Sequence, residues 1–112
     1  VSEWPDPVNR AFAHVNPEIY VSMQGPSELG ASGKLLNWER GADIHKIKVP
    51  TLVIGALHDT MDPEYKRWMA QELPNGRYLH CPDGSHLAMY DDQQVYFQGF
   101  IQFIHDVDAG KV

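Results

Sequence analysis

The chain has 112 residues, of which 43% are hydrophobic and 21% are charged, and its formal net charge is −6 at pH 7. These values are typical of one globular domain, and the acidic balance argues against nucleic acid as a partner, because phosphate binding needs clustered Lys and Arg. The single Cys81 excludes an intrachain disulfide and fits a reducing, cytoplasmic compartment. We expect no membrane contact, because no apolar run approaches the roughly 18 residues of a membrane span and Val1 begins no signal peptide.

The N-terminal third is rich in proline and glycine, which predicts a loop-rich or helical layer. We expect one helix to begin within residues 11–15 and a second to cover residues 17–23. Asn16 suits the N-cap of the second helix, and Pro17 suits its first position. Residues 35–47, which include Trp38 and mixed charges, are expected to form a connector.

From residue 49 onward the pattern is more regular. Residues 51–56 are apolar without alternation, which predicts a parallel strand buried on both faces. The run Asp62-Pro63-Glu64 predicts a helix start, with a helix to about Leu73, and residues 77–81 form a short strand. A final helix is expected over about residues 91–107. Its buried face is expected to contain Phe97, Phe100, Ile101, Ile104 and Val107.

The order strand, helix, strand, helix predicts a βαβ unit with a trailing helix in residues 41–112. A strand that is apolar on both faces needs neighbours on both sides, and this chain supplies one. We therefore expect another segment of the polypeptide, or another chain, to complete the sheet.

Two residues lie where this topology places catalytic groups. Asp59 follows the first strand at its carboxyl end, and His86 lies in a turn after the second strand. An acid after one strand and a histidine after the next is the order of the last two members of the Ser–Asp–His triad in α/β-hydrolases. Asp59 would orient the imidazole, and His86 would act as general base and then general acid. Asp62 already serves as the helix cap, so a capping role does not account for Asp59.

The nucleophile of such a triad is expected in a G-x-S-x-G motif, which the chain lacks. Ser32 lies in the run Gly30-Ala31-Ser32-Gly33-Lys34, without the final glycine. The sequence therefore predicts that the nucleophilic serine lies on an N-terminal part of the enzyme outside this chain.

Other reactive residues allow less favoured interpretations. The histidines show no recognised metal spacing, although a zinc site formed by His58, His80 and His86 is conceivable. Cys81 could act as a nucleophile with His86, but its place inside a strand favours a buried structural thiol. We expect neither a metal nor a cofactor.

With these residues placed, residues 10–106 resemble the proline iminopeptidases, which are serine exopeptidases of the α/β-hydrolase fold. Residues 50–55 (PTLVIG) and 58–63 (HDTMDP) are similar to the acid segment of that family. Residues 75–78 (NGRY) and 84–92 (GSHLAMYDD) are similar to its histidine segment. Residues 16–20 (NPEIY) and 23–28 (MQGPSE) are similar to the end of its cap domain, and GPSE is the most specific of these signs.

The resemblance implies an α/β fold: the C-terminal part of an α/β-hydrolase, with parallel strands and flanking helices, preceded by the end of a helical cap domain. Residues 1–40 would be the end of the cap and a connector, and residues 41–112 the βαβα part. It also implies that Glu28 binds the substrate's amino terminus, which is cationic at neutral pH. Some members carry a second amine-binding Glu after the triad acid, where this chain has Thr60.

Three functions follow as alternatives. The leading one is the C-terminal chain of a serine exopeptidase that releases N-terminal proline, or another first residue, from peptides or amino-acid amides with a free N-terminus. The second is a related amidase or esterase that acts on amino-acid derivatives. The third is a non-catalytic fragment whose exposed sheet edge and apolar faces bind a partner.

Overall fold

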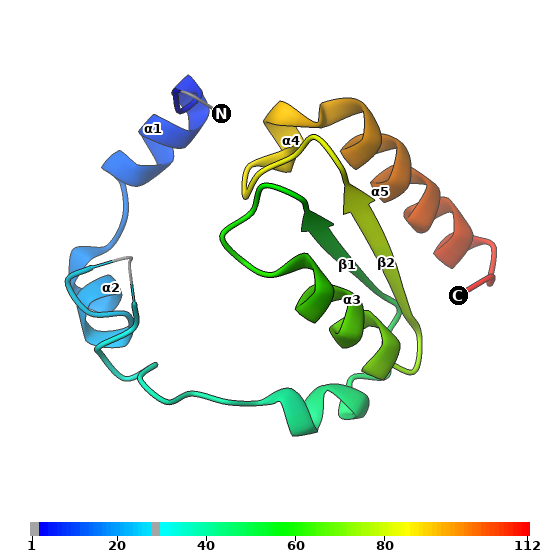
Figure 1. The fold of residues 1–112 in the computed structure, drawn as a ribbon, viewed down its shortest axis with the longest axis horizontal. Helices are drawn as coiled ribbons and strands as arrows, with labels where there is room; N and C mark the ends of the chain where they lie inside the picture. The colour runs from blue at the N-terminus through cyan, green and yellow to red at the C-terminus, as the bar shows by residue number, and fades with distance from the viewer. Residues whose placement is uncertain (1–2, 28–29) are drawn as a thin grey trace. The chain divides into compact units, whose positions relative to one another are not determined.

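The computed structural model describes residues 3–27 and 30–112. The chain divides into two compact units, one that ends at Arg40 and one that covers Gly41–Val112 (Figure 1). The first contains the helices α1 (Asp6–Ala13) and α2 (Pro17–Met23). The second contains the 3-10 helix η1 (Gly41–Lys46), the strands β1 (Thr51–Ala56) and β2 (Gly76–Cys81), and the helices α3 (Pro63–Glu72), α4 (Ala88–Asp91) and α5 (Gln93–Asp108).

Helix α1 begins five residues before the range in which a helix start was expected, and it ends at Ala13, so that prediction was wrong. The local reason lies in its first turn, where Pro7 has the fixed φ that suits a helix start and Asp6 favours the positive end of the helix dipole. Asp6 also pairs with Arg10 one turn later, at 2.9 Å.

Helix α2 begins as predicted. The Asn16 side chain accepts a hydrogen bond from the Ile19 backbone N–H at 3.2 Å, and Pro17 occupies the first turn. After this helix, Gly25 has a φ of +99°, a left-handed conformation that glycine adopts without strain. The backbone N–H of Ser32 then bonds to the Gln24 carbonyl, so the chain folds back on the end of α2.

The two strands pair in parallel, which confirms the predicted βαβ unit (Figure 1). The register runs from Thr51 opposite Gly76 to Ala56 opposite Cys81, so both strands end at the same edge. Helix α3 connects them and lies against both. Parallel pairing requires such a crossover, because the second strand must start again at the same end of the sheet.

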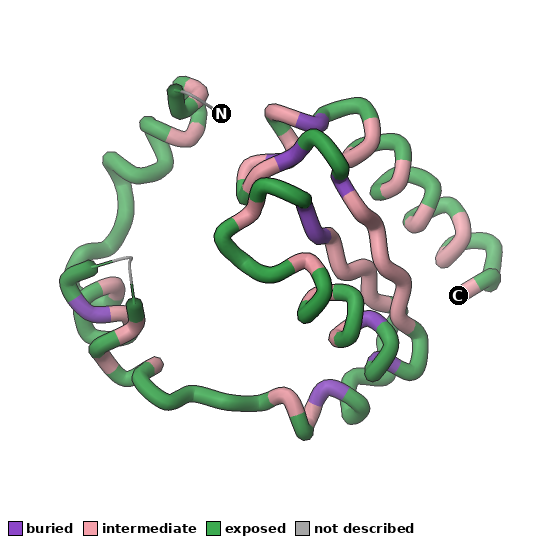
Figure 2. The backbone as a smooth tube through the Cα atoms, viewed as in Figure 1, coloured by how far each residue is buried: buried purple, intermediate pink, exposed green. Residues whose placement is uncertain are grey.

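In both strands the fully buried residues lie at the carboxyl end (Figure 2). Ala56, Cys81 and Ala88 form the fully packed cluster. On the face that carries Tyr78, the Arg67 guanidinium of α3 lies 4.4 Å from the centre of the tyrosine ring. The loops that follow the two strands thus start from a buried cluster.

The final helix differs from the expectation in two ways. A short separate helix, α4, precedes α5. Of the expected buried face, Phe97, Phe100, Ile101 and Ile104 are 38–48% exposed, and Val107 alone of the five is partly buried. The face that packs contains Val95, Tyr96, Gly99 and Phe103, all partly buried. Gly99 explains this choice, because a Cβ there would lie 2.5 Å from Leu79 of β2, so the glycine lets helix and strand approach closely. Within the described part of the chain, no helix has the length and apolarity needed to cross a membrane.

The predicted cap of α3 gives a direct test of this local structure. The Asp62 carboxylate accepts a hydrogen bond from the Glu64 backbone N–H at 2.9 Å. Asp62→Ala removes this partner, and we expect the free energy of unfolding to fall by about 1 kcal/mol, measured by urea unfolding. Asp62→Ser keeps a capping oxygen and should remain close to the wild type. Equal losses in both variants would contradict the capping role.

Candidate active site

The loops after β1 and β2 are tied to each other by backbone hydrogen bonds. The Leu57 N–H bonds to the Cys81 carbonyl at 3.1 Å, and the His58 N–H bonds to the Gly84 carbonyl at 2.9 Å. The pairing of the strands thus continues into the two loops. The residues that follow, Asp59 and His86, are held side by side as a result.

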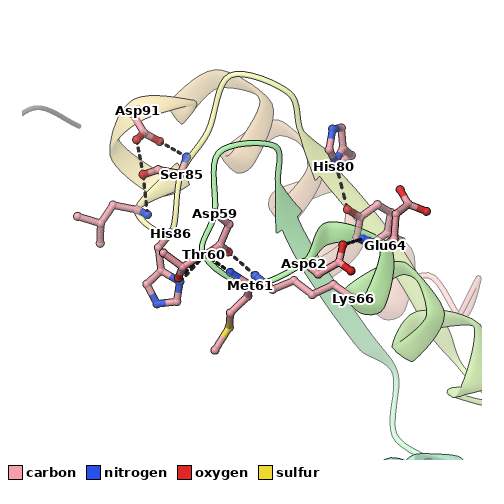
Figure 3. Close-up of polar contacts among 12 residues, drawn as sticks. Asp59, Thr60, Met61, Asp62, Glu64, Lys66, His80, Ser85, His86 and Asp91 are labelled. Carbon is pink, nitrogen blue, oxygen red and sulfur yellow. Dashed lines mark hydrogen bonds and ion pairs between the residues drawn. The ribbon is translucent and has the colours of Figure 1, made fainter. Parts of the chain in front are cut away.

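Asp59 and His86 form a hydrogen-bonded pair, with His86 Nδ1 at 3.0 Å from Asp59 Oδ1 (Figure 3). Their environments differ strongly, because the side chain of Asp59 is 2% exposed and that of His86 is 62% exposed. The acid is therefore fixed beneath the surface. The imidazole that contacts it is largely exposed.

The carboxylate of Asp59 has further partners on both oxygens. Oδ2 pairs with Lys66 Nζ at 2.5 Å, and Oδ1 also accepts the Met61 backbone N–H at 3.1 Å and the Thr60 hydroxyl at 3.5 Å. Burial raises the pKa of Asp59, but the bonds from Lys66, Met61 and His86 outweigh it and lower the pKa from 3.8 to about 2. The acid is accordingly ionised at any pH at which an imidazole titrates.

The turn that carries His86 is fixed by a carboxylate of α4. Asp91 accepts the Ser85 backbone N–H at 3.0 Å and the Ser85 hydroxyl at 2.5 Å, and that hydroxyl accepts the Leu87 N–H at 3.1 Å (Figure 3). The buried Asp92 accepts the Asp83 N–H at 3.0 Å. The backbone on both sides of His86 is thus held by side chains that follow it in sequence.

A small pocket of about 160 Å³ adjoins the pair. Its lining includes Lys66, His86, Met89 and Tyr96, together with the end of β1. Its lining thus combines apolar groups with the Asp59–Lys66 ion pair. It can hold a small group beside the imidazole.

Three further expectations from the sequence concern Cys81, a metal site and Glu28. Cys81 is fully buried, which confirms the structural thiol, and burial followed by the charges of Asp92 and Asp91 raises its pKa. Among the described residues, no three His, Cys, Asp or Glu side chains are grouped as a metal ion would require. The predicted amine-binding residue, Glu28, lies outside the described residues.

Sequence reasoning missed Lys66, Ser85 and Asp91 as members of this site. Lys66 left a signal, because it lies near the start of α3, where the positive end of the helix dipole disfavours a cation unless a carboxylate is at hand. Ser85 and Asp91 lie within the histidine segment, but their contact depends on the short helix α4, which the sequence pattern did not separate from α5.

The lowered pKa of Asp59 predicts a pH-dependent contribution to stability. Because the pKa is below its ordinary 3.8, the contribution is present above that value and is lost as pH falls through about 2. We expect the difference in unfolding free energy between the wild type and Asp59→Asn to shrink by about 2 kcal/mol between pH 5 and pH 2, measured by urea unfolding. Asp108→Asn, at an exposed position at the end of α5, is the matched control. A difference that stays constant over this range would refute the ion-pair account.

Comparison with known proteins shows to which sequences and folds this chain is similar. No protein-family model matches the chain, but curated proteins do. The chain is 55% identical to a proline iminopeptidase of Flavobacterium johnsoniae over 112 residues, all of the chain and 38% of that protein. It is 52% identical to a proline iminopeptidase of Elizabethkingia meningoseptica, with 97% of the chain and 37% of the relative covered. For one of Chitinophaga pinensis the identity is 50%, over 96% of the chain and 36% of the relative.

The fold is confirmed by a solved structure. The crystal structure of VinJ, an α/β-hydrolase, matches with a TM-score of 0.83 at 24% identity, over 95% of this chain and 36% of that one. The chain thus spans little more than a third of the length of the proteins it matches. The resemblance found in the sequence motifs is confirmed: over its whole length the chain is similar to proline iminopeptidases, and its fold is that of part of an α/β-hydrolase.

Proposed function

We propose that the longer protein to which this chain belongs is a serine exopeptidase that releases N-terminal proline, or another first residue, from peptides. Asp59 and His86 are its acid and base, and the nucleophilic serine lies on a part of the polypeptide outside this chain. The observation that carries the proposal is the buried carboxylate hydrogen-bonded to one nitrogen of an exposed imidazole.

The pair supplies two functions of the reaction. With Nδ1 donating to Asp59, the neutral imidazole has its lone pair on Nε2, which can take the proton from a serine hydroxyl as that oxygen attacks the scissile carbonyl. The imidazolium then gives the proton to the leaving amine, and water reverses the sequence to release the acyl group. Asp59 holds the ring in the required tautomer and stabilises its charged form.

Exposed apolar surface supports the presence of a further protein part. The outer face of α5, formed by Phe97, Phe100, Ile101 and Ile104, is 38–48% exposed. The described strands form one two-stranded sheet, although β1 has the continuous apolar pattern of a strand inside a larger parallel sheet. We assign the remainder of the polypeptide to these surfaces. In this arrangement residues 41–112 complete the hydrolase domain, and residues 1–40 end a cap domain.

Two further assignments are each supported by a single feature of the sequence. Glu28 is proposed to bind the substrate's amino terminus, since its GPSE motif resembles the family's and a carboxylate is the natural partner of an ammonium group. A cytoplasmic location is proposed from the single free Cys81, which is typical of reducing compartments.

The catalytic assignment predicts large losses of rate in the complete protein. His86→Ala and Asp59→Asn should each lower kcat for a proline amide by roughly four powers of ten, because one variant removes the base and the other leaves the ring in the wrong tautomer. The measurement is steady-state hydrolysis of a chromogenic proline anilide.

His45→Ala, at an exposed position of η1, is the control and should keep full activity. If His86→Ala retains wild-type kcat, the enzyme assignment fails. If the complete wild-type protein hydrolyses no amide or ester but this chain still binds a partner protein, the non-catalytic alternative holds instead.

The amine-binding assignment predicts a loss that depends on the substrate. Glu28→Ala should lower kcat/KM for substrates with a free amino terminus by roughly 10- to 100-fold, the usual effect of losing a charged hydrogen bond. N-blocked and plain ester substrates should be hydrolysed as before. Glu72→Ala, at the exposed end of α3, is the matched control. A uniform loss on all substrates would favour the amidase or esterase alternative.

A further inference from the structure

A lysine is bound to the same buried carboxylate as the candidate base. Lys66 Nζ lies 2.5 Å from Asp59 Oδ2, and its side chain is 16% exposed (Figure 3). The two oxygens of Asp59 are therefore divided, with Oδ1 directed to His86 and Oδ2 to Lys66. Two basic side chains, His86 and Lys66, therefore share the single negative charge of Asp59.

Because this ion pair is largely buried, the attraction between its charges is stronger than in a pair on the surface. Exposed pairs are screened by water and contribute little, whereas Asp59 is 2% exposed and Lys66 16%. An ammonium group this close disfavours a second positive charge on the same carboxylate. Protonation of His86 creates such a charge, so Lys66 opposes it.

The other charged or titratable groups on the surrounding helices have different positions or contacts. From α4, Asp91 is bound to both donors of Ser85. From α5, Tyr96 lines the adjoining pocket. The second cation of α3, Arg67, lies over the ring of Tyr78 on another face. Lys66 is thus the cation that, within the described residues, is in contact with the Asp59–His86 pair.

We propose that Lys66 is a positioning residue that sets the pH range of catalysis. It holds Oδ2 so that Oδ1 faces the imidazole, and its charge limits the stabilisation of the imidazolium. We therefore expect the acid limb of the pH profile of catalysis to lie at lower pH with Lys66 present than with an unpaired Asp59. This inference rests on the proposed serine-peptidase function.

The test is the pH dependence of kcat/KM for a proline anilide, measured on the complete protein. Lys66→Gln keeps a donor for Oδ2 but removes the charge, and Lys66→Met removes both. In both variants the acid limb of the profile should move to higher pH by roughly half a unit to one unit. Lys66→Arg keeps the charge and should leave the limb in place. Lys46→Met, on η1 at 67% side-chain exposure, removes a charge away from the site and serves as control.

The outcomes separate this inference from the proposed function. If His86→Ala abolishes hydrolysis but Lys66→Gln leaves the acid limb unmoved, the role of Lys66 is refuted while the triad stands. If the Lys66 variants lower the maximum of kcat/KM but leave the acid limb of the pH profile in place, Lys66 has only a structural role. If His86→Ala has no effect, the proposed function itself fails.

A measurement on the unmodified protein covers the case in which the variants do not fold. The ¹⁵N resonance of the Lys66 ammonium group, assigned in the wild type, should change across the same acid limb as His86 gains its proton. A Lys66 resonance that is constant through that limb overturns the inference whatever the variants do.

Discussion

The parallel pairing of β1 with β2 is the interaction on which the candidate site depends. Its register places Ala56 opposite Cys81, so two separate loops start from one edge of the sheet. The backbone bonds from Leu57 and His58 extend that pairing beyond the strands. Without it, the acid and the base would belong to unrelated turns. Because the strands are paired, the short loops that follow β1 and β2 are enough to bring Asp59 and His86 within hydrogen-bond distance.

Much of this unit could be predicted from sequence because its signals are local. The apolar run of β1 and the Asp62–Pro63 helix start act on their own residues, and the topology then brings Asp59 and His86 to the same edge. The packed face of α5 was predicted wrongly, since that helix is apolar on more than one side and periodicity cannot say which side packs. Gly99 determines which face of α5 packs, because it lets the helix approach Leu79, a residue twenty positions earlier in the chain. Lys66, Ser85 and Asp91 depend in the same way on side-chain direction, which a pattern of residue types does not contain.

Asp59 and His86 are held in place in different ways. Asp59 is buried, and donors from three neighbours and the imidazole fix its carboxylate. His86 is fixed through its backbone, by the contacts of Ser85 with Asp91, while its ring remains open. This arrangement suits a base that must meet a partner group from another part of the protein. The acid needs no such freedom, and its burial keeps water from weakening the ion pairs.

The acid and the base are 27 residues apart in sequence, and the segment between them is itself a helix and a strand. Closing that loop therefore adds little chain entropy to what those elements already cost. The Asp59–His86 pair lies within one contiguous stretch of the polypeptide, so no segment distant in sequence is needed to bring its two members together. A cleavage of the polypeptide before residue 51 would accordingly leave both members on one fragment.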